Sequence, residues 1–365
     1  MPGVRHALHR GGADHPVGRD DERQVGVGEP VLREHRRGLR RTGLDPRVRL
    51  VDAGEEVAQT MVLRLEPPPD DGDVLADGTH ARHVTMPAMA TLRELLAGPQ
   101  PVLAPGAYDA LSARLVERAG FPAVYMTGFG ASASLLGRPD VGLLSFDEMA
   151  GHARRLAQAV SVPLIADADD GYGNPLNVMR TVREYAAAGV AALHIEDQVA
   201  PKRCGHMEGK DVIETAEMVE KVRAAVEARG EDGPLIIART DARAVEGLDA
   251  ALERARRYRE AGADALFVEA PETEQEIEAV AAAFPDVPLV FNWVDGGKTP
   301  QLPLERIREL GFALVIYPVT TLFAAARAVA DVLDRLGEHE VPSFDAFTDM
   351  IGLPEMRALE ARFAT

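Results

Sequence analysis

Short apolar runs alternate with longer amphipathic stretches along the chain from residue 91 onward. The longer stretches are about 10 to 16 residues long and repeat apolar residues at the i, i+3, i+4 spacing of a helix. The short runs are apolar without alternation, which is typical of parallel strands covered by helices on both faces. Eight strands are predicted, at residues 102–105, 123–127, 163–167, 192–196, 235–239, 265–269, 289–292 and 314–317.

A repeated pattern supports the alternation of strand and helix. Residues 119–128, 188–197 and 261–270 each begin with Ala-Gly and continue through a short link into an apolar run. A helix that ends in this way can close with glycine in the left-handed conformation. The clearest predicted helices lie at 212–229 and 248–261. Copies about 70 residues apart correspond to about 35 residues per strand–helix unit, and eight such units make a (β/α)8 TIM-type barrel. An open doubly wound sheet is the alternative, but no Gly-x-Gly-x-x-Gly motif follows the first strand.

Most of the predicted strands end in polar residues. In a parallel barrel these ends meet at one rim, where barrel enzymes keep their active sites. Helix capping alone would not place polar side chains at the ends of so many successive strands, so a functional site is predicted there. The strand-end residues are Thr127, Asp167 with Asp169, Glu196 with Asp197, Arg239 with Asp241, Glu269, Asn292 and Tyr317.

Two of these strand-end residues form a candidate metal site. Asp167 and Asp169 are separated by one residue, so alternation along a strand would put both side chains on the same side. Two carboxylates on one face repel each other unless a cation lies between them. Carboxylate oxygens with retained waters suit Mg²⁺, or Mn²⁺ in its place. The alternative is a solvated turn rich in Asp and Gly, but such a turn does not need an apolar strand leading into it.

The only cysteine in the chain, Cys204, lies in a basic loop at residues 201–210 that also contains glycine. Lys202, Arg203 and His206 surround it in sequence, and nearby cations favour thiolate over thiol. The flanking glycines indicate a loop that can move, so Cys204 is a candidate acid, base or nucleophile. A buried structural cysteine beside a solvated basic turn is the alternative.

Composition and charge exclude several classes of function. The 365 residues include 58 acidic and 40 basic side chains, for a net charge of −18. This balance argues against general affinity for nucleic acid or anionic membranes, but not against a small anionic substrate held by local cations. No apolar run approaches the roughly 20 residues of a membrane span. A single cysteine rules out an internal disulfide framework, so a cytoplasmic protein is predicted.

The first 85 residues differ from the rest. They contain no Phe, Tyr, Trp, Ile, Cys or Lys, but they carry six of the ten histidines. Such a segment buries too little apolar surface to offset its chain entropy, so disorder is expected. A start site assigned too early is the alternative, with the working protein beginning at Met86 or Met89. In both cases residues 86–365 are predicted to form a single barrel domain.

From about residue 92 to the end, the chain resembles the isocitrate lyase and phosphoenolpyruvate mutase superfamily. The most specific match is Lys-Arg-Cys-Gly-His at 202–206. The chain is most similar to the branch that holds carboxyphosphonoenolpyruvate phosphonomutase, 2,3-dimethylmalate lyase and the plant petal death protein. The other matching motifs are residues 125–128, 137–142, 167–173, 196–198 and 238–241, with Asn292.

The resemblance implies a barrel whose last helix is exchanged between subunits, a homotetramer, and dependence on Mg²⁺. It also implies a small carboxylate substrate, either a 2-hydroxy diacid or an enolpyruvate derivative. Asp167 and Asp169 would hold Mg²⁺, while Glu196 and Asp140 would order metal-bound waters or face the reacting carbon.

The resemblance assigns the remaining residues to the substrate and to a gating loop. Thr127, Gly128 and Arg239 would grip the substrate carboxylate, with Tyr125 packed beside them. Cys204 and His206 would lie on the gating loop together with Lys202, Arg203 and Gly205. Glu269 and Asn292 would line the far wall of the pocket.

Chemistry favours a lyase among the family's activities. A divalent cation and an arginine on a carboxylate stabilise enolate charge where it develops. The predicted reaction is therefore cleavage of a carbon–carbon bond in a methylmalate- or methylisocitrate-like 2-hydroxy diacid, giving a 2-oxo acid such as pyruvate. Cys204 would protonate the departing carbanion. Methylisocitrate is the less favoured substrate, because Met207 stands where relatives that use it tend to carry Arg.

Two other functions stay open. In a phosphonomutase the same metal and arginine would hold pyruvate enolate, and the thiol would have less to do. A non-catalytic binding protein would be expected to have lost a metal carboxylate or the thiol, and this chain has kept both.

Overall fold

The computed structural model describes residues 48–50, 63–65, 90–205, 209–338 and 340–363. The chain divides into two compact units, Met1–Thr79 and His80–Thr365. In the first unit, β1 (Val48–Leu50) pairs with β2 (Leu63–Leu65) in antiparallel register. The other residues of the predicted N-terminal extension lie outside the described residues, so its disorder stays a prediction.

The second unit contains the predicted barrel. Its eight strands are all parallel to their neighbours, in the spatial order β8-β7-β6-β5-β4-β3-β10-β9. A parallel bridge between Leu266 and Leu289 links the two ends of this order, so the sheet closes on itself. The strands are β3 (Val102–Ala107), β4 (Val124–Met126), β5 (Leu164–Asp167), β6 (Ala192–Glu196), β7 (Leu235–Thr240), β8 (Ala265–Val268), β9 (Val290–Asn292) and β10 (Leu314–Tyr317).

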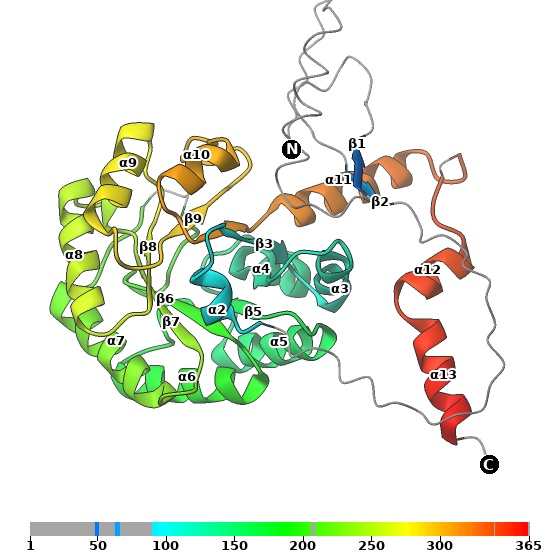
Figure 1. Ribbon diagram of the computed structural model, residues 1–365, viewed down its shortest axis with the longest axis horizontal. Helices are drawn as coiled ribbons and strands as arrows, with labels where there is room; N and C mark the ends of the chain where they lie inside the picture. The colour runs from blue at the N-terminus through cyan, green and yellow to red at the C-terminus, as the bar shows by residue number, and fades with distance from the viewer. Residues whose placement is uncertain (1–47, 51–62, 66–89, 206–208, 339, 364–365) are drawn as a thin grey trace, which may run out of the picture. The chain divides into compact units, whose positions relative to one another are not determined.

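Helices follow the strands and surround them (Figure 1). Each Ala-Gly that was predicted to end a helix has its glycine at positive φ, for example 91° at Gly189, where the chain turns from helix into strand. The helices are α2 (Leu92–Leu96), α3 (Ala110–Arg118), α4 (Gly128–Leu136), α5 (Phe146–Ala159), α6 (Pro175–Ala188), α7 (Thr215–Arg229), α8 (Leu248–Glu260), α9 (Glu274–Ala283), α10 (Leu304–Glu309), α11 (Thr320–Asp334), α12 (Phe344–Met350) and α13 (Leu353–Phe363).

One predicted helix begins later than expected. The apolar spacing placed its start at residue 212, but α7 begins at Thr215. Val212 instead forms an antiparallel bridge with Gln198, and the Ile213 amide donates to the Asp197 carbonyl at 2.9 Å. Backbone hydrogen bonding just before α7 therefore joins the end of the preceding loop to the segment that follows β6.

The core has two layers. Alternate strand residues such as Ile165, Ile237 and Phe267 fill the barrel interior, together with Leu92 and Leu96 of α2. The larger cluster packs the other faces of the strands against the surrounding helices. Because both faces are filled with side chains, the strand ends are held firmly at the rim.

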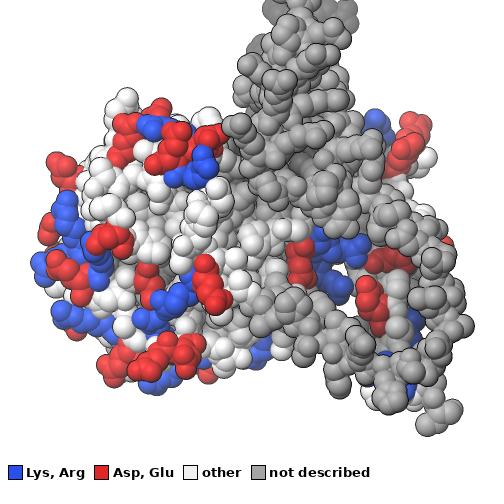
Figure 2. All heavy atoms as spheres, in the orientation of Figure 1, with Lys and Arg blue, Asp and Glu red and all other residues white. Residues whose placement is uncertain are grey.

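The described helices differ in how they meet solvent. On the face shown in Figure 2, acidic and basic side chains are interspersed over the barrel helices. Ion pairs between neighbouring helices include the contact between Arg306 of α10 and Glu274 of α9 at 3.0 Å. In contrast, α11, α12 and α13 contain no buried residue. None of the helices in the described part of the chain is both long and apolar enough to cross a membrane.

Candidate active site

A cavity of about 50 Å³ lies at the carboxyl-terminal ends of the strands. Residues from β4 to β10 contribute to it, because parallel strands all end at the same rim. Its lining residues are Tyr125, Thr127, Phe129, Asp140, Asp167, Glu196, Lys202, Arg203, Cys204, Gly205, Arg239, Glu269, Asn292, Val294, Pro318 and Val319.

The structure brings most of the predicted site residues into this one cavity. Of the residues assigned to the metal, the substrate or the gating loop, the exceptions are Gly128, Asp169 and His206. Of the other strand-end residues, Asp197, Asp241 and Tyr317 do not line the cavity. A side chain at Gly128 would place its Cβ 2.3 Å from Asp167 Oδ2, so Gly128 lies against the Asp167 carboxylate. Asp169 lies just behind Asp167, and His206 falls outside the described residues.

Asp167 and Asp169 are adjacent for a different reason than predicted. Only Asp167 belongs to β5. Asp169 lies in the following turn at φ 47°, a left-handed conformation that Asp tolerates better than most residues. Its amide donates to Asp167 Oδ1 at 2.9 Å. A turn that folds back onto the strand end, and not strand alternation, therefore brings the two carboxylates together.

The two carboxylates have opposite pKa shifts. Burial raises the pKa of Asp169 to about 6, with the negative charges of Asp167 and Asp140 adding to the effect against Lys202. Burial also disfavours the charged form of Asp167, but nearby groups that include Lys202 and Arg239 outweigh it and lower its pKa. Asp167 is therefore the carboxylate that is ionised over the wider pH range.

Lys202 places a cation between two carboxylates. Its Nζ lies 2.7 Å from both Asp140 Oδ2 and Asp169 Oδ1, and the side chain is only 7% exposed. Burial alone would lower the pKa of Lys202, but the surrounding carboxylates raise it well above its ordinary value. The ammonium is therefore charged, and it offsets part of the repulsion in an acid-rich pocket.

Arg239, near the end of β7, is held by contacts with Asp241, Phe267 and Glu196. Its Nε and Nη2 donate to the two oxygens of Asp241, at 2.9 and 3.1 Å. Its guanidinium also lies 5.0 Å from the centre of the Phe267 ring and 3.3 Å from Glu196 Oε2. Paired in this way, a planar guanidinium is fixed in orientation before any carboxylate ligand arrives.

Two more acids, Glu196 and Glu269, lie beside Arg239 at the ends of the neighbouring strands, and an amide follows on β9. Burial raises the pKa of Glu196 well above its ordinary value, despite the nearby charge of Arg239. Glu196 Oε1 is buried and has no hydrogen-bond partner in the described part of the chain. Asn292 Nδ2 donates to Glu269 at 3.3 and 3.2 Å, so the amide fixes the direction of that carboxylate.

Two of the predicted substrate-gripping residues also have contacts within the protein. Thr127 Oγ1 accepts from the Gly130 amide at 3.2 Å and so caps α4. The Tyr125 hydroxyl is hydrogen-bonded to His194 Nε2 at 2.8 Å inside the barrel. Burial lowers the pKa of His194 to about 4, so this ring is neutral at physiological pH.

Cys204 is half-buried and reaches the cavity from the loop after β6. Its amide donates to the Asp140 carbonyl at 3.2 Å. Gln198 fixes the residue before it, donating to the Arg203 carbonyl at 2.8 Å and accepting from the Arg203 amide at 2.9 Å. The backbone of the thiol-bearing segment is therefore held by hydrogen bonds to the Asp140 carbonyl and to the Gln198 side chain.

Sequence reasoning did not select several residues that shape this site. His194 was detectable, because it lies two residues before Glu196 on β6 and so faces the same side. Lys210 is one of only four lysines, but its contact with Asp241 spans 31 residues and no sequence pattern predicts it. The apolar wall of Phe129, Val294, Pro318 and Val319 comes from loops and helix starts without a periodic pattern.

The donor set fits a hydrated divalent cation. Among the described residues, no three or more His, Cys, Asp or Glu side chains are grouped so as to hold a metal ion. Mg²⁺ does not need such a cage, because it is commonly bound by one or two carboxylates with several waters. Two observations indicate that a positive charge is stabilised in this pocket. Glu196 Oε1 has no hydrogen-bond partner among the described residues, and the Lys202 ammonium lies between Asp140 and Asp169.

The chain belongs to the phosphoenolpyruvate phosphomutase family, whose model matches residues 92–336. The predicted membership of the wider superfamily is thereby confirmed. The chain is 46% identical to 2,3-dimethylmalate lyase of Eubacterium barkeri over 288 residues, which covers 77% of this chain and 99% of that protein. It is 44% identical to the chloroplastic carboxyvinyl-carboxyphosphonate phosphorylmutase of Arabidopsis thaliana over 275 residues, covering 72% of this chain and 81% of that protein.

Solved structures share the barrel. A phosphonopyruvate hydrolase in complex with oxalate and Mg²⁺ superposes with a TM-score of 0.68 at 35% sequence identity, covering 74% of this chain and 97% of that one. The predicted (β/α)8 fold is confirmed by this likeness and by the strand order. The family contains both lyases and a phosphonomutase, so the choice between them depends on the site.

Proposed function

We propose that this enzyme is a Mg²⁺-dependent lyase that cleaves a carbon–carbon bond of a 2-hydroxy diacid to give a 2-oxo acid such as pyruvate. The observation that carries the proposal is the joint placement of Cys204 and Arg239 in one cavity. A retro-aldol cleavage requires a proton donor beside a group that binds the substrate carboxylate. The Arg239 guanidinium is that group and is called the carboxylate clamp below. The 46% identity to 2,3-dimethylmalate lyase supports the same reaction class.

In this mechanism the Arg239 guanidinium holds one substrate carboxylate, with the Thr127 and Gly128 segment beside it. The proton of the 2-hydroxyl passes to a cavity carboxylate, and the bond between C2 and C3 breaks. The electron pair of that bond remains on the departing carbon, and the Cys204 thiol protonates it. The products are a 2-oxo acid and a saturated acid, so atoms and charge balance.

Asp167 and Asp169 would hold Mg²⁺, with Glu196 and Asp140 accepting hydrogen bonds from its waters. When bound, the ion stabilises negative charge on the oxygens of the enolate. The apolar wall of the cavity keeps bulk water away from the carbanion, which would otherwise be protonated without control.

A phosphonomutase is the second candidate, favoured by the 44% identity to the Arabidopsis enzyme. It would use the same clamp and ion, but it requires no proton from Cys204. A non-catalytic barrel is the third, and the presence in one cavity of the thiol, Arg239 and four acids, Asp140, Asp167, Glu196 and Glu269, argues against it.

A substrate panel separates these functions. Dimethylmalate, methylisocitrate, oxaloacetate and carboxyphosphonoenolpyruvate are each incubated with the enzyme, with Mg²⁺ or with EDTA, and products are detected by mass spectrometry. Release of a 2-oxo acid from a 2-hydroxy diacid only with Mg²⁺ is the expected result. Rearrangement of the phosphonate substrate alone would establish the mutase.

A homo-oligomer, with a tetramer expected, is also proposed, formed by exchange of the C-terminal helices. The support is the apolar surface of α11 to α13, which contain no buried residue. Exposed apolar side chains of this kind are typical of surfaces covered by another subunit. They are Phe323, Val329, Leu333, Phe344, Phe347, Met356, Leu359 and Phe363. A cytoplasmic location is proposed from the single cysteine.

Sedimentation analysis tests the assembly. The full chain should sediment as a tetramer, and a chain ending at residue 338 should dissociate because it lacks α12 and α13. A monomeric full chain would overturn this proposal without affecting the proposed reaction.

A further inference from the structure

Lys210 is a buried lysine that the reaction as described does not use. Its side chain is 1% exposed, and its Nζ donates to Asp241 Oδ1 at 2.7 Å. Nζ also donates to the Gly205 carbonyl. A buried ammonium is costly to desolvate unless it is paired and hydrogen-bonded. The two contacts therefore identify Asp241 and the Gly205 backbone as the groups that Lys210 holds together.

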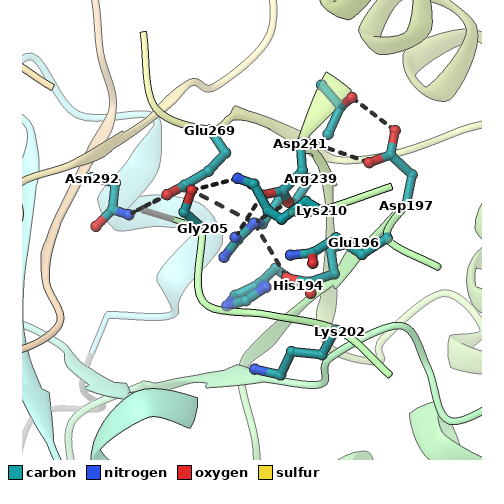
Figure 3. A network of polar contacts seen from close by, with 12 residues as sticks. His194, Glu196, Asp197, Lys202, Gly205, Lys210, Arg239, Asp241, Glu269 and Asn292 are labelled. Atoms are coloured by element: carbon teal, nitrogen blue, oxygen red, sulfur yellow. Dashed lines mark hydrogen bonds and ion pairs between the residues drawn. The ribbon is translucent and has the colours of Figure 1, made fainter. Parts of the chain in front are cut away.

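Its partner Asp241 is shared with the carboxylate clamp. The same carboxylate accepts from Nε and Nη2 of Arg239. Lys210 and Arg239 are therefore joined through one fully buried acid, as Figure 3 shows. Any displacement of this acid changes the orientation of the clamp.

Asp241 itself is fixed to the barrel. Its amide donates to Asp197 Oδ1 at 2.9 Å. Asp197 Oδ2 accepts in turn from the hydroxyls of Thr240 and Tyr258, both at 2.7 Å. The acid that Lys210 and Arg239 share is thus held rigidly just after the end of β7. The part of the structure that Lys210 positions is therefore the loop at Gly205.

The other contact of Lys210 holds the residue next to the thiol. A Cβ at Gly205 would lie 2.5 Å from Arg239 Nη2 and 2.2 Å from Glu269 Oε1. The backbone at Gly205 therefore lies directly on the clamp, with Cys204 as its neighbour in the chain. Lys210 holds this backbone in place through the Gly205 carbonyl.

The structure assigns to Lys210 the role of a positioning residue: through Gly205 and Asp241 it fixes the Cys204 thiol relative to the Arg239 guanidinium. It touches no substrate. A group that sets the distance between a proton donor and a carboxylate clamp affects the transition state more than substrate binding.

The test is the rate at which iodoacetamide alkylates Cys204 in the full-length, ligand-free protein. Cys204 is the only thiol, so the label reports on one position. Lys210→Met removes the ammonium at similar side-chain length. Loss of a buried hydrogen bond to a charged group should release the segment and speed alkylation by about tenfold or more. The kinetic arm rests on the proposed lyase function: kcat should fall by about tenfold or more with a smaller change in KM.

Lys221→Met is the matched control. Lys221 is also buried, at 3% side-chain exposure, and its Nζ donates to the Asp170 carbonyl at 3.1 Å. Removing it should lower the melting temperature without changing the alkylation rate. If Lys210→Met is not recovered folded, Lys210→Gln replaces it, because its amide is polar enough for a buried site but is uncharged and one bond too short to join Gly205 to Asp241 as the ammonium does. It is also expected to speed alkylation.

Each possible outcome either supports the positioning role of Lys210 or overturns it. Wild-type alkylation and kcat in a folded Lys210 variant would overturn the proposal and leave Lys210 as a stabilising ion pair. Faster alkylation in both lysine variants would also overturn it, because the effect would then be general loosening. If the wild-type enzyme cleaves no diacid but the two lysine variants still differ in alkylation, the proposed reaction fails and the positioning role stands.

Discussion

At the scale of single residues, the site is a cluster of buried charges that hold one another in place. Lys202 compensates Asp140 and Asp169, and Asp241 orients Arg239. Removing one partner of such a pair leaves an uncompensated buried charge, which is far more disruptive than removing both. Conservative substitutions are therefore the informative ones.

The clamp gives the first prediction. Arg239→Lys keeps the positive charge but loses the planar fork that donates to both oxygens of a carboxylate. We expect kcat/KM for a cleaved diacid to fall by about 10²-fold or more. Steady-state kinetics measure the change, and a melting curve shows whether the fold is retained. Near-normal kinetics would make Arg239 a structural ion-pair partner instead.

The metal site gives a pH-dependent prediction. The pKa of Asp169 is raised to about 6 in the folded protein, from an ordinary value of 3.8. In the metal-free protein, the stabilising effect of this shift is fully present below 3.8 and is lost as the pH rises towards 6, because the folded state holds the proton more tightly.

Mg²⁺ should reverse this trend, because it binds only the ionised carboxylate. We expect the rise in melting temperature on adding Mg²⁺ to be larger at pH 7.5 than at pH 5. Thermal unfolding with Mg²⁺ and with EDTA at both values measures it. An Asp169→Asn variant should show little rise at either pH, and an equal rise in wild type at both would remove Asp169 from the metal site.

At the scale of secondary-structure elements, the alternation of apolar runs and amphipathic stretches predicted all eight strands of the barrel. This succeeded because parallel strands buried on both faces leave a strong apolar pattern. The convergence of strand-end residues such as Asp167 and Arg239 followed from the same topology. The proximity of Asp169 depended instead on a left-handed turn, which strand periodicity does not report.

Contacts between distant segments were also outside the reach of sequence patterns. The start of α7 at Thr215 reflects a bridge from Val212 to Gln198, a pairing decided by the packed barrel. The link from Lys210 to Asp241 is of the same kind. Local propensity describes what each segment prefers by itself, and tertiary contacts override it where segments meet.

The close approach of the loop to β7 and β8 gives a prediction at this scale. Gly205→Ala would place a methyl group 2.2 Å from Glu269 Oε1 and 2.5 Å from Arg239 Nη2, so the loop must move away. We expect kcat/KM to fall by about 10²-fold and Cys204 to be alkylated faster.

The control is Gly151→Ala in α5, where the nearest atom to an added Cβ is 3.8 Å away. This change should stabilise the helix by about 0.5–1 kcal/mol and leave activity unchanged. Normal activity in Gly205→Ala would show that the loop does not approach the clamp during the reaction.

At the scale of the whole molecule, catalysis is assigned to the unit His80–Thr365. The first 85 residues lack the aromatic and Ile side chains that would support a core. Deleting them should leave the melting temperature and kcat unchanged. A fall of several degrees in melting temperature, or a change in oligomeric state, would show that the segment docks on the barrel and contributes to it.

In the proposed reaction this barrel breaks a carbon–carbon bond with Cys204 as the proton donor. The most direct measurement compares the Mg²⁺-dependent release of pyruvate and propionate from 2,3-dimethylmalate by wild type and Cys204→Ser. A hydroxyl is a much weaker acid than a thiol, so cleavage should slow by about 10²-fold or more in the variant. Cleavage by Cys204→Ser at the wild-type rate would contradict the claim.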